Sequence, residues 1–168
     1  MTAIVIPHDS NERPHSEELA GPLEFQAATG GWLEPIKLEA VNASIYMSGD
    51  GQRARGNFNA RATALHWIYG HGTARRLLLG DAVLVAPVRR PDGTLPGFLN
   101  GLSADHEFVV QLSPDEVAWY NTPLRFPTVF DAALWAVLID GVLADGISIR
   151  IGALAASDDV MGMPGVSW

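Results

Sequence analysis

The sequence predicts an α+β fold, in which a mostly antiparallel sheet packs with a few helices. Three observations favour this class: short β-branched segments that end at glycine or proline, apolar segments of helical length with recognisable caps, and turn signals between strand candidates. Hydrophobic residues make up 48% and charged residues 18% of the 168 residues. This balance is typical of a chain that folds around a core, and it is far from that of a disordered one.

The strand candidates of the first half are short and rich in β-branched or aromatic residues. They are residues 2–6, 32–38, 43–47 and 77–88, of which the last is interrupted at Gly80-Asp81 and is strongest at residues 82–85. A polar, acidic loop is expected from the end of the first strand to Gly21. The glycine-rich residues 48–52 form a turn signal, which favours a hairpin or a meander.

Two helices are expected in the same half. Pro22 suits the first position of a helix, and the pair Gly30-Gly31 suits a helix stop that needs positive φ at one of the two glycines. Residues 59–69 form the second helix candidate, which ends before the glycines at 70 and 72.

The second half begins with turn signals at residues 90–97, followed by a strand at 107–112. Ser113, Pro114 and Glu116 resemble a capping box and predict a short helix. Residues 128–144 are the clearest helix candidate, and because they are apolar on most sides we expect burial in the core or at a homo-oligomer contact. Alternation at 146–151 predicts a strand. We therefore expect residues 1–88 to form an α+β core and residues 89–168 to elaborate the same domain.

Charge is distributed unevenly along this chain, whose net charge is −8. Residues 1–25 carry −4, residues 26–103 carry +3 and residues 104–168 carry −7. The middle section therefore predicts an anion-binding face of arginines within an acidic protein, although solvated surface arginines are the alternative. Nonspecific binding to nucleic acid is not expected, because it favours basic domains.

Several classes of site are excluded or disfavoured by residue type. The chain has no cysteine, so it has no disulfide and no thiolate nucleophile or ligand. None of its five histidines stands in a recognised metal-binding spacing, and no phosphate loop or nucleophile elbow is present. We expect no metal and no cofactor, and we favour a protein that is not an enzyme. The N-terminus does not resemble a signal peptide and no apolar run could span a membrane, so a cytoplasmic location without membrane contact is expected.

The most informative polar pattern places arginine and asparagine at alternate positions. If residues 53–61 are extended, five side chains point the same way and could bind a phosphate, a nucleotide or an acidic partner by bidentate hydrogen bonds. A solvent-facing strand edge is the alternative. The candidate binding residues are Arg53, Arg55, Asn57, Asn59 and Arg61, together with Arg75 and Arg76.

Residues 1–88 also carry a family resemblance. The succession of Gly30-Gly31-Trp32, the turn Gly49-Asp50-Gly51, the segment from Asn57 to Ala62 and the strand from Leu79 to Val85 resembles the domain of unknown function numbered 3846. Members are small proteins of phages, plasmids and bacteria. The resemblance implies a phage or mobile-element setting, and it supplies no catalytic residue.

These observations leave three functional hypotheses. The first is a non-enzymatic accessory protein of a phage or mobile element, which binds a host protein, another macromolecule or a second copy of itself. The second is a protein that sequesters a small anionic ligand of the nucleotide type on the arginine face. The third is an enzyme whose site only the fold assembles.

Overall fold

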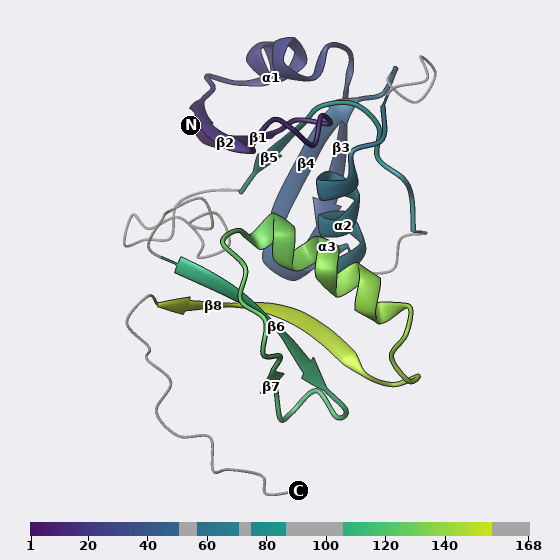
Figure 1. The fold of residues 1–168 in the computed structure, drawn as a ribbon. Helices are drawn as coiled ribbons and strands as arrows, with labels where there is room; N and C mark the ends of the chain where they lie inside the picture. The colour runs from purple at the N-terminus through teal and green to yellow at the C-terminus, as the bar shows by residue number, and fades with distance from the viewer. Residues whose placement is uncertain (51–56, 71–74, 87–105, 156–168) are drawn as a thin grey trace, which may run out of the picture.

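The structure is a computed structural model, which describes residues 1–50, 57–70, 75–86 and 106–155. Within these ranges it has three α-helices and two antiparallel sheets, which confirms the α+β class (Figure 1). The helices are α1 (Pro22–Thr29), α2 (Ala60–Tyr69) and α3 (Val129–Asp140). The strands are β1 (Thr2–Ile6), β2 (His15–Glu18), β3 (Leu33–Leu38), β4 (Ala43–Ser48), β5 (Ala82–Val85), β6 (His106–Ser113), β7 (Tyr120–Asn121) and β8 (Ser148–Ala155).

The larger sheet has five strands in the order β2-β1-β5-β4-β3, and every neighbouring pair is antiparallel. Its edge strand β3 contains Pro35, which lacks a backbone N–H and is tolerated at an edge. The β3–β4 hairpin pairs Leu33 with Ser48 at one end and Leu38 with Ala43 at the other. The smaller sheet has the order β7-β6-β8, with β6 and β8 paired over eight residues each.

One face of the larger sheet is covered by α1. Phe25 of this helix is buried beneath it with Ala3, Val83 and Val85 of the sheet, and its ring lies 5.2 Å from that of Tyr46. Pro22 occupies the start of the helix, and Gly30 ends it with φ of 76°. The predicted stop at Gly30-Gly31 is therefore confirmed, with Gly30 as the residue in the left-handed region.

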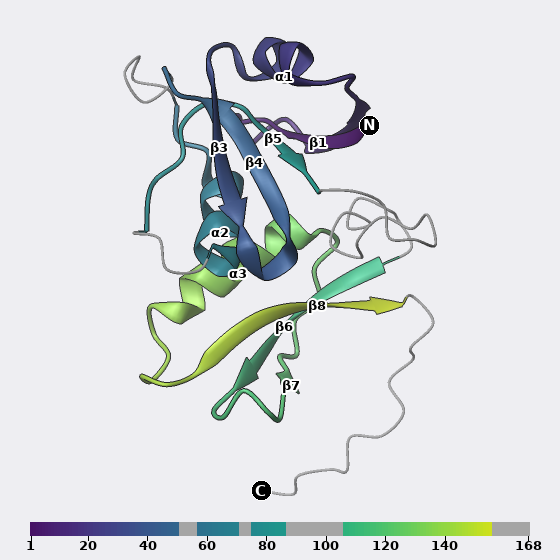
Figure 2. The same cartoon turned by 180° about the vertical axis from the view of Figure 1, so that it is seen from behind.

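The opposite face of the larger sheet packs on the main core with α2, α3 and the smaller sheet. This core joins Ile45 and Leu84 of the larger sheet to Leu65 of α2, Phe130 of α3 and Phe108 of β6. Seen from behind, the β3–β4 hairpin lies in front of α2 and α3, while α1 and the smaller sheet lie at opposite ends of the molecule (Figure 2). Side chains from both sequence halves thus share one core.

Two expectations for local structure are wrong. The acidic loop before Gly21 contains strand β2, which pairs with β1 through its backbone although its four side chains are all exposed. No helix follows Ser113: the Asp115 carboxylate accepts hydrogen bonds from the backbone of Val117 and Ala118, and Glu116 adopts φ of 59°. Because that φ is incompatible with a right-handed helix, the capping signal forms a turn instead.

The remaining predicted elements differ mainly in their ends. The helix expected at 128–144 ends at Asp140, followed by Gly141, and the strand expected at 146–151 runs from Ser148 to Ala155. The turn signals at 90–97 and the tail from residue 162 lie outside the described residues. In the described part of the chain, no helix has the length and apolarity needed to cross a membrane.

Candidate functional site

The alternating arginine and asparagine residues do not form one extended face in the part that the structure describes. Arg53 and Arg55 lie outside the described residues. Asn59 is buried at the N-cap of α2, where its side chain accepts a hydrogen bond from the backbone of Ala62. Its amide also donates to the carbonyls of Ile6 and Gly80. Because α2 begins at Ala60, the extended geometry needed for a shared face ends before Arg61.

Arg61 binds the chain's own loop after β1. Its guanidinium donates to the carbonyl oxygens of Asp9, Ser10 and Glu12, at 3.3, 2.9 and 2.8 Å. Three carbonyl acceptors on one guanidinium hold that loop against the start of α2. The side chain is therefore engaged in an internal contact and is not displayed for a ligand.

The two later arginines are also internally paired. Arg75 forms an ion pair with Asp140 and lies over the ring of Trp67 at 5.5 Å. Arg76 makes a bidentate pair with Glu34 of β3, at 2.5 and 2.8 Å. The hydrogen bond from Arg76 lowers the pKa of Glu34 below its ordinary value. These arginines thus join the segment after α2 to α3 and to the larger sheet.

A small polar cluster connects the ends of β1 and β5. Both the ring Nδ1 and the backbone N–H of His8 donate to Oδ1 of Asp81, at 2.7 and 2.8 Å. Because the carboxylate holds the proton on Nδ1, the other ring nitrogen, Nε2, accepts from the amide of Asn57 at 3.0 Å. Both ring nitrogens have partners, which makes this cluster a structural tie between three segments.

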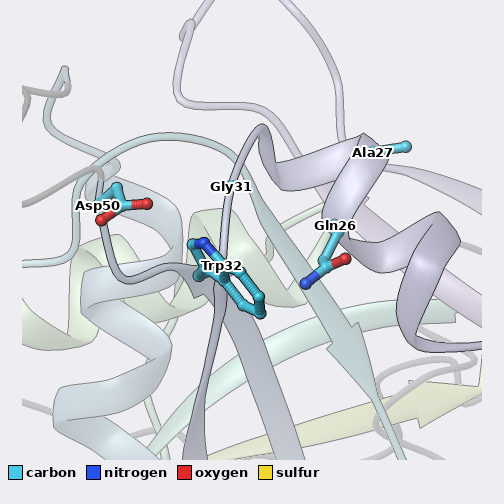
Figure 3. Close-up of a pocket in the computed structure, with 5 residues that line it drawn as sticks. All are labelled: Gln26, Ala27, Gly31, Trp32 and Asp50. Atoms are coloured by element: carbon cyan, nitrogen blue, oxygen red, sulfur yellow. The ribbon is translucent and has the colours of Figure 1, made fainter.

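An open pocket of about 460 Å³ lies where α1, β3 and the end of β4 meet. It is lined by Gln26 and Ala27 of α1, by Gly31 and Trp32 before β3, and by Asp50 after β4. Figure 3 shows the indole of Trp32 between Asp50 and Gln26, with the amide of Gln26 turned toward it. We call this site the Trp32 pocket.

The local backbone explains why these side chains meet. The left-handed turn at Gly30 carries the chain from α1 to β3, and the backbone N–H of Gly49 donates to the carbonyl of Trp32 at 2.7 Å. A Cβ on Gly31 would clash with Oγ of Ser48, and it would lie 3.8 Å from Oδ2 of Asp50. Glycine at position 31 therefore allows the close approach of the two segments.

The functional groups of the Trp32 pocket contrast with the arginines, because they make no polar contact with other residues that the structure describes. Trp32 is 75% exposed. Neither its indole N–H, the Asp50 carboxylate nor the Gln26 amide has a hydrogen-bond or ion-pair partner among the residues that the structure describes. The pocket thus combines a flat aromatic surface, an acceptor of two hydrogen bonds and an amide that both donates and accepts. This set of groups suits a planar ligand with polar edges.

The sequence patterns assign these residues to secondary structure and, for Trp32 and Asp50, to the segments that carry the family resemblance, but not to a binding site. Trp32 was expected at the start of a strand, Asp50 in a turn and Gln26 in a helix. A tryptophan placed directly after paired glycines and just before the first residue of β3 is the signal that could have drawn attention to it. The neighbourhood of Asp50 depends on the pairing of β3 with β4, which becomes known only with the register.

A second hollow lies between the two central helices. It has a volume of about 310 Å³ and we call it the α2–α3 groove. Exposed Phe58 and Leu138 stand at this groove, with exposures of 50% and 72%. Among the described residues that line it, all except Thr63 have apolar side chains: Phe58, Ala60, Ala64, Trp67, Leu134, Val137 and Leu138.

Within the described ranges, no three histidine, aspartate or glutamate side chains gather where they could hold a metal ion.

Comparison of the chain with models of known protein families, with curated proteins and with solved structures found no match.

Proposed function

We propose that this chain is a binding protein, whose ligand is of the nucleotide type and inserts its base into the Trp32 pocket. The observation that carries the proposal is the exposed indole of Trp32, flanked by Asp50 and Gln26 with no internal partners among the described residues. The proposal therefore assigns the ligand to a different site from the arginine face that the sequence pattern favoured.

Stacking supports this choice of ligand. An aromatic side chain contributes roughly 1–3 kcal/mol to the binding of a base that stacks on it, and every base offers a flat face. The volume of about 460 Å³ falls within the range of small-ligand pockets, roughly 300–1,000 Å³. Groups beside the indole would then orient the base through hydrogen bonds to its edge.

Titration with neutral nucleosides tests the proposal, since a nucleoside presents the base without the charge of a phosphate. Isothermal titration calorimetry of the wild type should detect binding, and Trp32→Ala should weaken it about tenfold, the effect of losing about 1.4 kcal/mol of stacking. Trp32→Phe should retain part of the affinity because it keeps a ring.

Tyr120→Ala provides the matched control, because Tyr120 is an exposed aromatic residue on the smaller sheet, with 63% exposure. It should bind as the wild type does. The proposal is overturned if no nucleoside binds, or if the Trp32→Ala variant binds as tightly as the wild type.

A second candidate function is binding to a macromolecule, for which self-association has a specific supporting observation. The α2–α3 groove is apolar, and exposed Leu138, a side chain of the kind that fills such a groove, stands on the same face. An isologous interface requires both features on one surface, so a second copy of the chain is the partner that we propose for it. A phage or mobile-element setting, and a host protein as partner, rest on the family resemblance alone.

A further inference from the structure

We infer that the Trp32 pocket selects guanine over adenine. This inference rests on the proposed function, and it names the class of base that the pocket binds. Three observations carry this inference: the acceptor-only chemistry of Asp50, its position beside the indole, and the size of the pocket. Each concerns residues that line the pocket directly.

Asp50 is the one ionisable side chain among the described residues that line the pocket. An ionised carboxylate accepts hydrogen bonds and donates none, and its two oxygens can accept from two parallel N–H groups. Oδ2 lies 3.8 Å from where a Cβ on Gly31 would stand, next to the segment that carries Trp32. In the proposed complex, a base stacked on the indole presents its edge to these oxygens.

Base edges differ in whether they match a carboxylate. Guanine carries two adjacent donors, the ring N1–H and the exocyclic amino group, and a carboxylate can accept from both. Adenine carries an amino group beside an unprotonated ring nitrogen, so one carboxylate oxygen would face a lone pair. The repulsive contact rejects adenine, and the bidentate contact favours guanine.

Gln26 lies on the other side of the indole, with its amide turned toward the ring (Figure 3). Its amino group can donate to an acceptor of the ligand, and a guanine oriented by Asp50 retains acceptors on the rest of its rim. A volume of about 460 Å³ has room for a two-ring base, because a cavity of about 150 Å³ already holds benzene. The negative charge of Asp50 also means that a phosphate on the ligand would be directed away from it.

The experiment compares guanosine, inosine and adenosine by calorimetry with the wild type and with Asp50→Asn. The wild type should bind guanosine about tenfold more tightly than adenosine, within the discrimination of a bidentate contact to a base edge. Inosine, which lacks the amino group of guanosine, should bind with intermediate affinity. In Asp50→Asn the amide can donate toward adenine, so the preference for guanosine should disappear.

Asp145→Asn is the matched control, because it removes one carboxylate charge from an exposed residue that does not line the pocket. It should keep the wild-type order of affinities.

A second titration asks whether the base comes from a nucleic-acid strand or from a free nucleoside or nucleotide. Its probe is a short strand of thymidines that contains one deoxyguanosine. If the protein binds this strand more tightly than it binds guanosine, the natural ligand is a strand; if it binds the strand equally or more weakly, the ligand is a free nucleoside or nucleotide.

The failure of this inference is distinguishable from that of the proposed function. If purine nucleosides bind at Trp32 with equal affinity, or adenosine binds better, the guanine selectivity is wrong while the binding function stands. If Asp50→Asn retains the full preference for guanosine, Asp50 is not the selecting group. If no nucleoside binds, both are overturned.

Discussion

Gly30 and Gly141 follow the C-terminal ends of two helices, but their backbones differ. Gly30 has φ of 76° after α1, whereas Gly141 after α3 has φ of −71° and remains in the right-handed region. Side chains with a Cβ are strained at the first position and tolerated at the second. A comparison of alanine substitutions at the two positions therefore separates the cost of backbone strain from the general effect of replacing a glycine at a helix end.

Gly30→Ala should lower the free energy of unfolding by about 1 kcal/mol, because alanine must adopt a left-handed conformation there. A Cβ at this site meets no neighbouring atom, so the cost is one of backbone conformation. Denaturant titration measures it. Gly141→Ala should be neutral or slightly stabilising, and equal effects of the two substitutions would contradict the assignment.

The Glu34–Arg76 pair makes stability depend on pH through a single carboxylate. The hydrogen bond from Arg76 lowers the pKa of Glu34 in the folded state below its ordinary value of 4.5. The resulting stabilisation is present above the unfolded pKa, and it is lost as pH falls through the lower pKa of the folded state. Because the pair is partly exposed, the effect is small and is reduced by salt.

The melting temperature of Glu34→Gln should therefore fall less steeply than that of the wild type as the pH drops below about 4.5. This is the ordinary pKa of glutamate, which the pair with Arg76 lowers in the folded state. Glu107→Gln is a suitable control because Glu107 is exposed on β6. A wild-type pH profile in the Glu34→Gln variant would show that the pair does not contribute to stability.

Helix α3 packs in the core that the two sheets share, and the two sides of this helix have different environments. Ala132, Ala133 and Ala136 are buried, whereas Leu138 is 72% exposed. Trp135 lies between these extremes and packs its ring against Phe126, at 5.6 Å between centroids. Burial of α3 in the core is thus observed for one side of the helix.

Trp135→Asp should destabilise the protein by about 3 kcal/mol, since it removes a packed aromatic ring and places a charge at a partly buried site. Trp135→Phe should retain most of the stability because it keeps the contact with Phe126. Thermal unfolding measures both variants. Wild-type melting of Trp135→Asp would show that this side of α3 does not hold the two sheets together.

Leu138→Glu tests the exposed side of the same helix. The substitution leaves the core intact, so the melting temperature of the monomer should change little. If two copies pack through the α2–α3 groove, the charge prevents the contact and sedimentation should show loss of the dimer. A wild type that sediments as a monomer at every concentration would contradict self-association through this groove.

At the scale of the whole molecule, the sequence predicts elements whose signals are local. Pro22 and Gly30 mark the ends of α1, and Asn59 caps α2 because its side chain reaches the backbone of Ala62 only three residues later. The α+β class follows from such segments together. The wrong helix after Ser113 has a local cause as well, because the Asp115 carboxylate stabilises a competing turn.

Long-range pairing explains what could not be predicted. β2 has no buried side chain and forms through its backbone bonds to β1. Arg76 and Glu34 are 42 residues apart, so no sequence pattern indicated that this arginine is internally paired. The Trp32 pocket likewise depends on the register of β3 with β4, and on α1 lying over the sheet beside them.

The central claim is that the Trp32 pocket is the binding site, and fluorine NMR of protein labelled with 5-fluorotryptophan tests it most directly. The chain has five tryptophans, and Trp32→Phe identifies the resonance of Trp32 by its loss. Addition of guanosine should shift that resonance in a saturable way and leave those of Trp67 and Trp135 in place. No shift at saturating guanosine, or a shift at another tryptophan while Trp32 stays unchanged, would contradict the account.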